Sequence, residues 1–257
     1  MPNIESATLT VGTGGAARAI ASQSRAGAAP GIFWLGGFRS DMIGSKAMAL
    51  DALGEEKGLA VTRFDYSGHG VSGGAFEDGT ISRWLEEAQA VFATTKGPQV
   101  IVGSSMGGWI ALLLVKAMLA AGTSRAQGLV LIAPGVDMTR ELMLGQFTPA
   151  EHEALQRFGH VDQPSQYSPT PYRITRKLVE DGENHLLFGN VIETGCPVTI
   201  LQGGQDPDVP QAQAIKLVTH ILHDPVTLTL IPDGDHRLSR PEDLARLKAA
   251  VMALVAD

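Results

Sequence analysis

A serine stands in a glycine-rich turn between an apolar strand and an apolar helix, at Gly103-Ser104-Ser105-Met106-Gly107-Gly108. Ile-Val precedes the turn at 101–102, and Trp-Ile-Ala-Leu-Leu-Leu-Val follows it at 109–115. Such a turn is so tight that its flanking positions have little room for side chains, which favours glycine there. The pattern is typical of a nucleophile elbow, which presents the serine hydroxyl at the end of a sheet. The chain must therefore build a buried strand that turns sharply into a helix.

Strands and helices alternate along most of the chain, which predicts a mainly parallel sheet with helices on both faces. Eight strands are predicted, at 8–11, 18–22, 32–35, 59–64, 99–102, 127–133, 198–202 and 226–231. Helices are predicted at 46–57, 81–95, 106–121, 211–222 and 241–255. The alternation lapses over 138–193, where prolines separate several predicted helices. We therefore expect an α/β core of residues 1–137 and 194–257, with 138–193 inserted as a helical lid over the carboxyl ends of the strands.

Composition bears on which partners the chain can bind and in which compartment it folds. The formal net charge of -7 and the 5% content of aromatic residues disfavour a nucleic-acid partner. The single cysteine, Cys196, excludes an internal disulfide and suits a reducing compartment. The sequence shows neither a secretory signal nor an apolar stretch long enough to span a membrane. We therefore expect a cytoplasmic protein, monomeric or dimeric.

A serine becomes a nucleophile only beside a base that a third group orients. On a nucleophile elbow the chain order is serine, acid, histidine. His236 is the favoured base because it lies in a loop among small and acidic residues after the strand at 226–231. Asp206 and Asp208 both follow the strand at 198–202, and Asp206 is favoured because it comes first after the double glycine. Asp137 is a third candidate acid, in a less common arrangement.

Two backbone N–H groups are candidates for binding a developing oxyanion. Met106 begins the helix after the elbow, where backbone donors and the helix dipole favour negative charge. Phe38 follows Gly36-Gly37, which allows close approach of the backbone to a substrate. The His and Asp residues do not fall into the usual metal-ligand spacings, so no metal and no cofactor is expected.

Several segments resemble the α/β-hydrolase superfamily, and more narrowly its branch of mitochondrial acyl-protein thioesterases and acyl-glucuronide esterases. They are the elbow, Phe64–Gly74, Gly203–Pro210, Asp235-His236-Arg237, Gly37–Ala47, Tyr167-Ser168 and Glu183–Leu187. The resemblance covers roughly residues 30–255. It implies an α/β-hydrolase fold with Ser105 as nucleophile, His236 as base, Asp206 as acid, and the Phe38 and Met106 N–H groups as oxyanion hole. Gln202 departs from the histidine that is common in that family.

The expected function is a serine hydrolase that cleaves carboxylic esters or thioesters of small or acylated substrates. Apolar residues of the predicted lid favour acyl or aromatic groups, although they also suit packing of the lid onto the core. Two alternatives remain open. One is a ligand-binding protein that has the fold without turnover. The other is a peptidase, which is disfavoured because no peptide-docking domain accompanies the core.

Overall fold

The computed structural model describes residues 4–164 and 171–256. Eight strands form one sheet in the order β1-β2-β4-β3-β5-β6-β9-β10. β2 runs antiparallel to both of its neighbours, and all other neighbours are parallel. The strands are β1 (Ile4–Val11), β2 (Arg18–Arg25), β3 (Ala28–Leu35), β4 (Leu59–Phe64), β5 (Gln99–Ser104), β6 (Ala126–Ile132), β9 (Val198–Gly203) and β10 (Val226–Ile231). The predicted mainly parallel sheet is confirmed.

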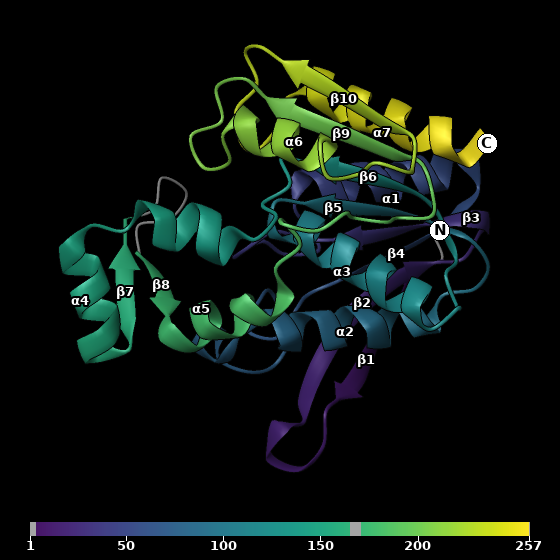
Figure 1. The fold of residues 1–257 in the computed structure, drawn as a ribbon. Helices are drawn as coiled ribbons and strands as arrows, with labels where there is room; N and C mark the ends of the chain where they lie inside the picture. Colours follow the sequence, from purple (N-terminus) through teal and green to yellow (C-terminus); the bar gives the residue numbers. More distant parts are fainter. Residues whose placement is uncertain (1–3, 165–170, 257) are drawn as a thin grey trace.

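Helices cover both faces of this sheet (Figure 1). The flanking helices are α1 (Ser45–Lys57), α2 (Ile81–Thr94), α3 (Met106–Ala120), α6 (Gln211–Val218) and α7 (Pro241–Ala256). Side chains of β5 alternate between two apolar clusters: Val100 and Val102 pack toward α1 and α7, whereas Ile101 packs toward α2, α3 and α6. Because both faces of the central strands are buried, these strands are mostly apolar on both faces.

Local signals set the helix boundaries. The Thr80 hydroxyl accepts a hydrogen bond from the Arg83 N–H and caps the start of α2. Gly58 takes the left-handed conformation that ends α1, with φ of 67°. α6 ends at Val218, four residues short of the predicted Leu222. Short helical turns lie at Gly14–Ala16, Phe76–Asp78, Thr139–Met143, Leu144–Gln146 and Glu183–His185.

In the segment 138–193, two short strands accompany the predicted helices. Besides α4 (Pro149–Phe158) and α5 (Arg176–Gly182), the segment contains β7 (His160–Gln163) and β8 (Tyr172–Thr175), which form a second, antiparallel sheet. Each of these strands is only four residues long. Their cross-strand pairs include Arg173 and Asp162, in which Arg173 Nε donates a hydrogen bond to Asp162 Oδ1 at 2.8 Å. Four residues are too few for an alternation of apolar and polar residues to identify a strand from sequence. Tyr167 and Ser168 lie outside the described residues.

The segment 138–193 lies on the side of the molecule toward which the arrowheads of β9 and β10 point (Figure 1). This is the edge where the carboxyl ends of the parallel strands meet, and where ligands bind in such folds. No helix in the described part of the chain is both long enough and apolar enough to cross a membrane.

Candidate active site

Ser105 occupies a strained turn between β5 and α3. Its backbone has φ of 55° and ψ of -119°, in a region that L residues other than glycine rarely adopt. A Cβ atom on Gly103 would lie 2.3 Å from the Gly107 carbonyl oxygen, and one on Gly107 would lie 2.1 Å from the Leu35 carbonyl oxygen. The two glycines therefore allow this backbone to pass close to its neighbours. The Ser105 N–H donates to the Ile132 carbonyl at 2.8 Å, which ties the turn to β6.

The structure brings Ser105, His236 and Asp206 together at the carboxyl ends of β5, β10 and β9. The His236 Nε2 atom lies 3.1 Å from Ser105 Oγ, and its Nδ1 atom lies 2.8 Å from Asp206 Oδ2. The Asp206 side chain is fully buried, whereas that of His236 is 16% exposed. One continuous chain of hydrogen bonds thus links a buried carboxylate through an imidazole to the hydroxyl of the half-buried Ser105.

Backbone and side-chain donors orient the Asp206 carboxylate. Its Oδ1 atom accepts hydrogen bonds from the N–H groups of Asp208 and Val209, both at 2.9 Å. The Gln202 Nε2 group donates to Oδ2 at 3.3 Å. Asp208 thus supports the loop through its backbone, while its side chain lines the neighbouring cavity. Potential metal-ligand atoms of Asp206, Asp208 and His236 lie within 4.8 Å of one another. The hydrogen bonds from His236 and from the Asp208 N–H to the Asp206 carboxylate hold these three residues together.

Asp137, the third candidate acid, binds the segment that returns from the insert. It is buried after β6, in a left-handed conformation with φ of 54°. Its carboxylate accepts hydrogen bonds from the N–H groups of Leu187 and Phe188, both at 2.8 Å. Burial raises the pKa of Asp137, and these N–H donors oppose that rise. Asp137 therefore joins the two ends of the segment 138–193.

The loop after β3 lies directly against the elbow. A Cβ atom on Gly37 would lie 3.2 Å from the Ser104 carbonyl oxygen and 3.3 Å from Ser105 Cβ. Phe38 follows this contact, and its ring packs edge-on against Phe76 with 4.8 Å between ring centroids. Met106 is the first residue of α3, where N–H groups have no partner within the helix. Both predicted oxyanion donors therefore belong to segments that meet at Ser105.

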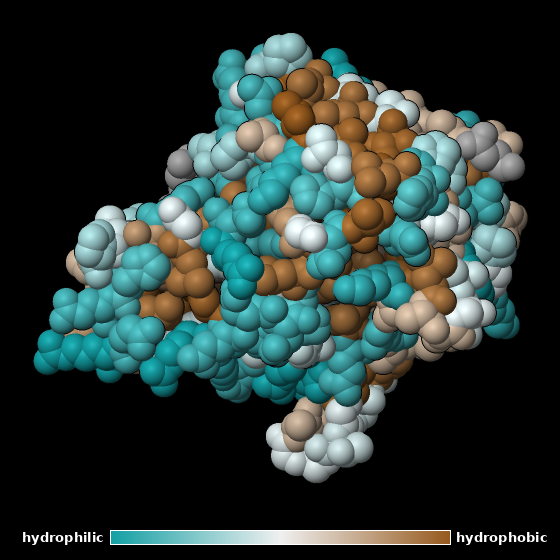
Figure 2. Space-filling model, in the orientation of Figure 1, coloured by the Kyte–Doolittle hydropathy of each residue, from teal (hydrophilic) through white to brown (hydrophobic). Residues whose placement is uncertain are grey.

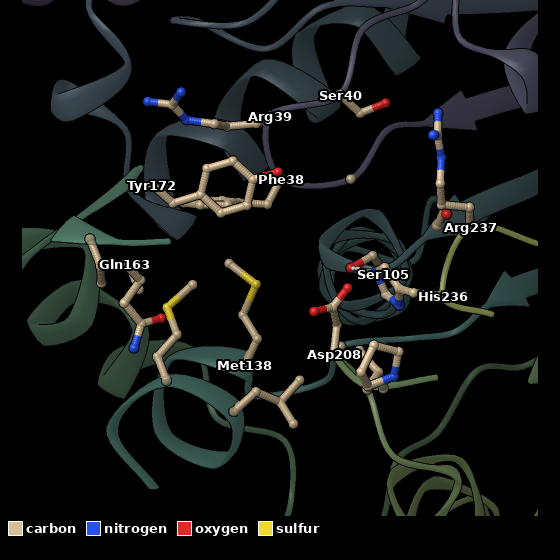
Figure 3. A pocket seen from close by; sticks show the side chains of 18 of the residues that line it. Phe38, Arg39, Ser40, Ser105, Met138, Gln163, Tyr172, Asp208, His236 and Arg237 are labelled. Carbon is tan, nitrogen blue, oxygen red and sulfur yellow. Dashed lines mark hydrogen bonds between the residues drawn. The ribbon is translucent and has the colours of Figure 1, made fainter. Parts of the chain in front are cut away.

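A cavity of about 360 Å³ opens beside Ser105 and His236 (Figure 3). Met138, Leu142, Met143 and Ile174 from the insert form an apolar wall. Figure 3 shows Ser40 and Arg237 on the side of the cavity away from Met138, and Trp34 and Lys46 also line the cavity. Figure 3 shows Arg237 and Asp208 on opposite sides of the Ser105–His236 pair. The cavity size lies within the usual range of small-molecule sites.

Sequence reasoning missed several residues of the cavity wall. Arg39 stacks over the rings of Phe76 and Tyr172, with its guanidinium carbon 4.4 and 5.3 Å from the two ring centroids. Lys46 Nζ donates to the Arg237 carbonyl oxygen, which links α1 to the loop of His236. Burial and the Arg237 charge lower the pKa of Lys46 to about 8. The only sequence signal for these residues is the Gly37–Ala47 segment, which carries the family resemblance.

The eight-stranded sheet, the elbow and the converging loops define an α/β hydrolase. The chain belongs to the alpha/beta hydrolase family, whose sequence pattern matches residues 28–247. It is 31% identical over 234 residues to the mitochondrial palmitoyl-protein thioesterase ABHD10 of Bos taurus, covering 89% of this chain and 74% of that protein. The Homo sapiens ABHD10 is 30% identical over the same length, covering 89% and 74%.

Solved structures agree with this relationship. The crystal structure of a protein from Agrobacterium vitis S4 is 50% identical and superimposes with a TM-score of 0.95, covering 98% of this chain and 99% of that one. Mouse ABHD10 superimposes with a TM-score of 0.85 at 27% identity, covering 98% of each chain. The predicted family and fold are confirmed, as is the prediction of an enzyme of the hydrolase class.

The expected cytoplasmic location is wrong. The curated relatives are named mitochondrial proteins, which points to a mitochondrial location instead. The expectation depends on the single cysteine and on the absence of a recognisable secretory signal or membrane-spanning stretch. An α/β body with one buried thiol suits the reducing interior of either compartment, so these features could not distinguish the two.

Proposed function

We propose that this chain is a serine hydrolase that cleaves carboxylic esters or thioesters through an acyl-enzyme intermediate. One observation carries the proposal: the unbroken hydrogen-bond chain from Asp206 through His236 to the Ser105 hydroxyl, at 2.8 and 3.1 Å. This is the arrangement in which a serine is activated by a base that an acid orients. The thioester option is supported by the relatives named palmitoyl-protein thioesterase.

In the proposed reaction, the Ser105 oxygen forms a bond to the acyl carbon while His236 Nε2 takes the hydroxyl proton. The carbonyl oxygen gains the negative charge, which the N–H groups of Phe38 and Met106 stabilise. The bond from the acyl carbon to the leaving oxygen or sulfur then breaks, and His236 returns its proton to that atom. Water repeats the sequence on the acyl-enzyme, which releases the acid and restores Ser105.

We also propose that residues 138–193 act as a lid on a core of residues 1–137 and 194–257. Met138, Leu142, Met143 and Ile174 belong to this segment and supply the apolar wall of the cavity. An acyl chain bound there would be shielded from water, which strengthens the electrostatic interactions around the reacting carbonyl.

Replacement of the candidate nucleophile tests the proposal. Ser105→Ala is expected to lower turnover of a 4-nitrophenyl ester by about 10⁴-fold or more and to abolish labelling by a fluorophosphonate probe. Ser104→Ala is the matched control, because it removes the neighbouring hydroxyl of the same turn, and it is expected to retain labelling. Full activity of Ser105→Ala would refute the assignment.

The same experiment separates the alternative functions. A ligand-binding protein without turnover would leave Ser105 unlabelled in the unmodified chain. A peptidase would hydrolyse peptide amides faster than esters with the same acyl group. A panel of 4-nitrophenyl esters and acyl thioesters of increasing chain length then defines the acyl preference.

A further inference from the structure

Arg39 has a backbone conformation that its residue type disfavours. It is the third residue of a turn in which the Ser40 N–H donates to the Gly37 carbonyl oxygen at 3.0 Å. Its φ of 57° lies in the left-handed region, and this position of such a turn usually holds glycine or asparagine. An arginine is strained there because its Cβ atom crowds the backbone. The contacts of the Arg39 side chain must therefore offset this strain.

The Arg39 guanidinium lies over two aromatic rings. Its central carbon is 4.4 Å from the ring centroid of Phe76 and 5.3 Å from that of Tyr172, and both distances are within the range of a cation–π interaction. Within residues 4–164 and 171–256, the guanidinium has no hydrogen-bond or ion-pair partner. Because the side chain is exposed to solvent, these two rings are the contacts that fix its position.

The two rings come from different parts of the molecule. Phe76 begins the helical turn Phe76–Asp78 of the core, whereas Tyr172 begins β8 in the insert. The Phe38 ring packs edge-on against both, with its centroid 4.8 Å from that of Phe76 and 6.1 Å from that of Tyr172. Figure 3 shows Arg39, Tyr172 and Phe38 grouped together at the cavity that they line. The same two rings thus hold both central residues of the turn.

This arrangement bears on the backbone N–H of Phe38, one of the two proposed oxyanion donors. In the part of the chain that the structure describes, no acceptor bonds this N–H group, so it can donate to a substrate oxygen. The turn also lies against the nucleophile, since a Cβ atom on Gly37 would be 3.3 Å from Ser105 Cβ. A donor stabilises an oxyanion only where the charge develops, so even a small displacement of the turn lowers the rate.

We propose that Arg39 is a positioning residue for the Phe38 N–H group. By stacking on Phe76 and Tyr172, it holds the strained turn in the conformation that directs this donor at the oxyanion. The inference rests on the proposed function and adds to it, because it makes one oxyanion donor depend on a contact with the insert. The oxyanion hole is complete only while β8 packs on the core and keeps the Tyr172 ring under Arg39.

Two substitutions at position 39 separate the effect of the side chain from that of the backbone. Arg39→Met keeps a stem of similar width without the guanidinium, and it is expected to lower kcat by about 5- to 30-fold. Outright removal of an oxyanion donor would cost about 10²-fold or more. Arg39→Gly relieves the strain, because glycine adopts a positive φ readily. A similar loss in Arg39→Gly is expected, since this variant also lacks the stacked guanidinium.

The division of the loss between kcat and KM distinguishes positioning from substrate binding. The substrate is 4-nitrophenyl butanoate, which is neutral and so is not attracted by the Arg39 charge. The oxyanion exists only near the transition state, so a displaced donor lowers kcat and leaves KM within about twofold of the unmodified value.

A pair of ketone inhibitors gives a second readout. Ser105 attacks 1,1,1-trifluoroheptan-2-one as it attacks an ester: the bond from Oγ to the carbonyl carbon forms, the hydroxyl proton passes to His236, and the ketone oxygen takes the negative charge. The inhibition constant of this ketone should rise in Arg39→Met by the factor by which kcat/KM falls. Heptan-2-one lacks the fluorines that favour this adduct, so its inhibition constant should change by less than about twofold.

A double-mutant cycle measures the part played by the insert. Tyr172→Leu removes the ring that the insert supplies. In this background, Arg39→Met should cause a loss of kcat that is at least about twofold smaller than in the unmodified enzyme, because the two residues act through one contact. Arg157→Met is the matched control and should leave kcat unchanged. Its guanidinium also lies over a ring, 5.2 Å from the centroid of Phe158, but this stack belongs to α4.

The outcomes separate this inference from the proposed function. If the unmodified enzyme hydrolyses no ester and Ser105 is not labelled, the proposed function is wrong. If esters are hydrolysed but Arg39→Met or Arg39→Gly retains full kcat, or the loss lies in KM alone, Arg39 does not position the donor and the hydrolase remains. An equal loss for Arg39→Met with and without Tyr172 shows that the insert takes no part. Thermal unfolding of each variant identifies any general loss of structure.

Discussion

His236 Nε2 lies 3.1 Å from Ser105 Oγ, although the two residues are 131 positions apart in the chain. Three parallel strands make this contact possible. β5 ends at the serine, and β9 and β10 end at the loops that carry Asp206 and His236. Because the carboxyl ends of parallel strands share one edge of a sheet, loops distant in sequence meet there.

The choice of acid can be tested by paired substitutions. Asp206→Asn is expected to lower kcat by about 10³- to 10⁴-fold, because an amide would favour the wrong imidazole tautomer at His236. Asp208→Asn keeps the backbone N–H that donates to Asp206, so its kcat should stay within about tenfold of the unmodified value. Steady-state measurement of kcat for both variants on one activated ester distinguishes the two candidate acids. A larger loss for Asp208→Asn would reverse the assignment.

Gly37 tests the contact between the oxyanion loop and the elbow. A Cβ atom there would meet the Ser104 carbonyl oxygen at 3.2 Å and Ser105 Cβ at 3.3 Å, so the loop must move by a few tenths of an ångström. Gly37→Ala is therefore expected to lower kcat by about 10- to 100-fold. Gly15→Ala, whose Cβ would meet nothing within 4 Å, controls for loss of glycine itself. Unchanged kcat in Gly37→Ala would exclude a role for this loop in rate enhancement.

The elbow and the alternation of strands and helices along the chain follow from local sequence, because each depends on a short pattern. The sheet order of the strands and the choice between Asp206 and Asp208 do not, because both depend on tertiary packing. Gly103 and Gly107 are required by backbone contacts within the turn, so the sequence marks them directly. The residues that line the cavity cannot be predicted from local sequence in this way. Lys46 and Tyr172 come from α1 and β8, and only tertiary packing brings them to the same cavity. The β7–β8 pair does not follow from local sequence either, because each strand has only four residues.

His69 should make the protein less stable in acid. Its side chain is buried beside Phe76 and Trp84, and burial lowers the pKa of His69 to about 4. In the unfolded chain a histidine has a pKa of about 6.5. Between these values the unfolded state binds more protons, so the free energy of unfolding falls as pH decreases from about 6.5 to 4. The expected loss across this window is on the order of 2 kcal/mol.

Urea unfolding at a series of pH values measures this slope. His69→Asn keeps a donor near the Ser67 carbonyl oxygen, which His69 Nδ1 approaches at 3.1 Å, but it does not titrate. The slope should therefore flatten in His69→Asn and persist in His223→Asn, whose side chain is exposed. An equal slope in the unmodified protein and His69→Asn would show that other groups cause the acid sensitivity.

Ser82 and Asp181 join the proposed lid to the core. The N–H and hydroxyl of Ser82 donate to the Asp181 carboxylate at 2.8 and 2.7 Å, and the hydroxyl also lies 2.7 Å from His185 Nε2. Ser82 belongs to the first turn of α2, where a carboxylate is favoured by the helix dipole. Asp181 belongs to α5, which packs Leu178 and Val179 into the protein.

Loss of this contact should loosen α5 without unfolding the sheet. Ser82→Ala is expected to lower the local stability of residues 171–185 by about 1 kcal/mol, because Asp181 loses the hydroxyl donor and keeps only the backbone N–H of residue 82. Hydrogen exchange should therefore accelerate in α5 and stay unchanged in β5 and α3. Lys177→Ala removes the exposed ion pair with Asp78 and should have little effect, since exposed pairs contribute little. If Ser82→Ala accelerates exchange equally in α5 and in β5, residues 138–193 do not open as a separate unit, and the lid proposal fails.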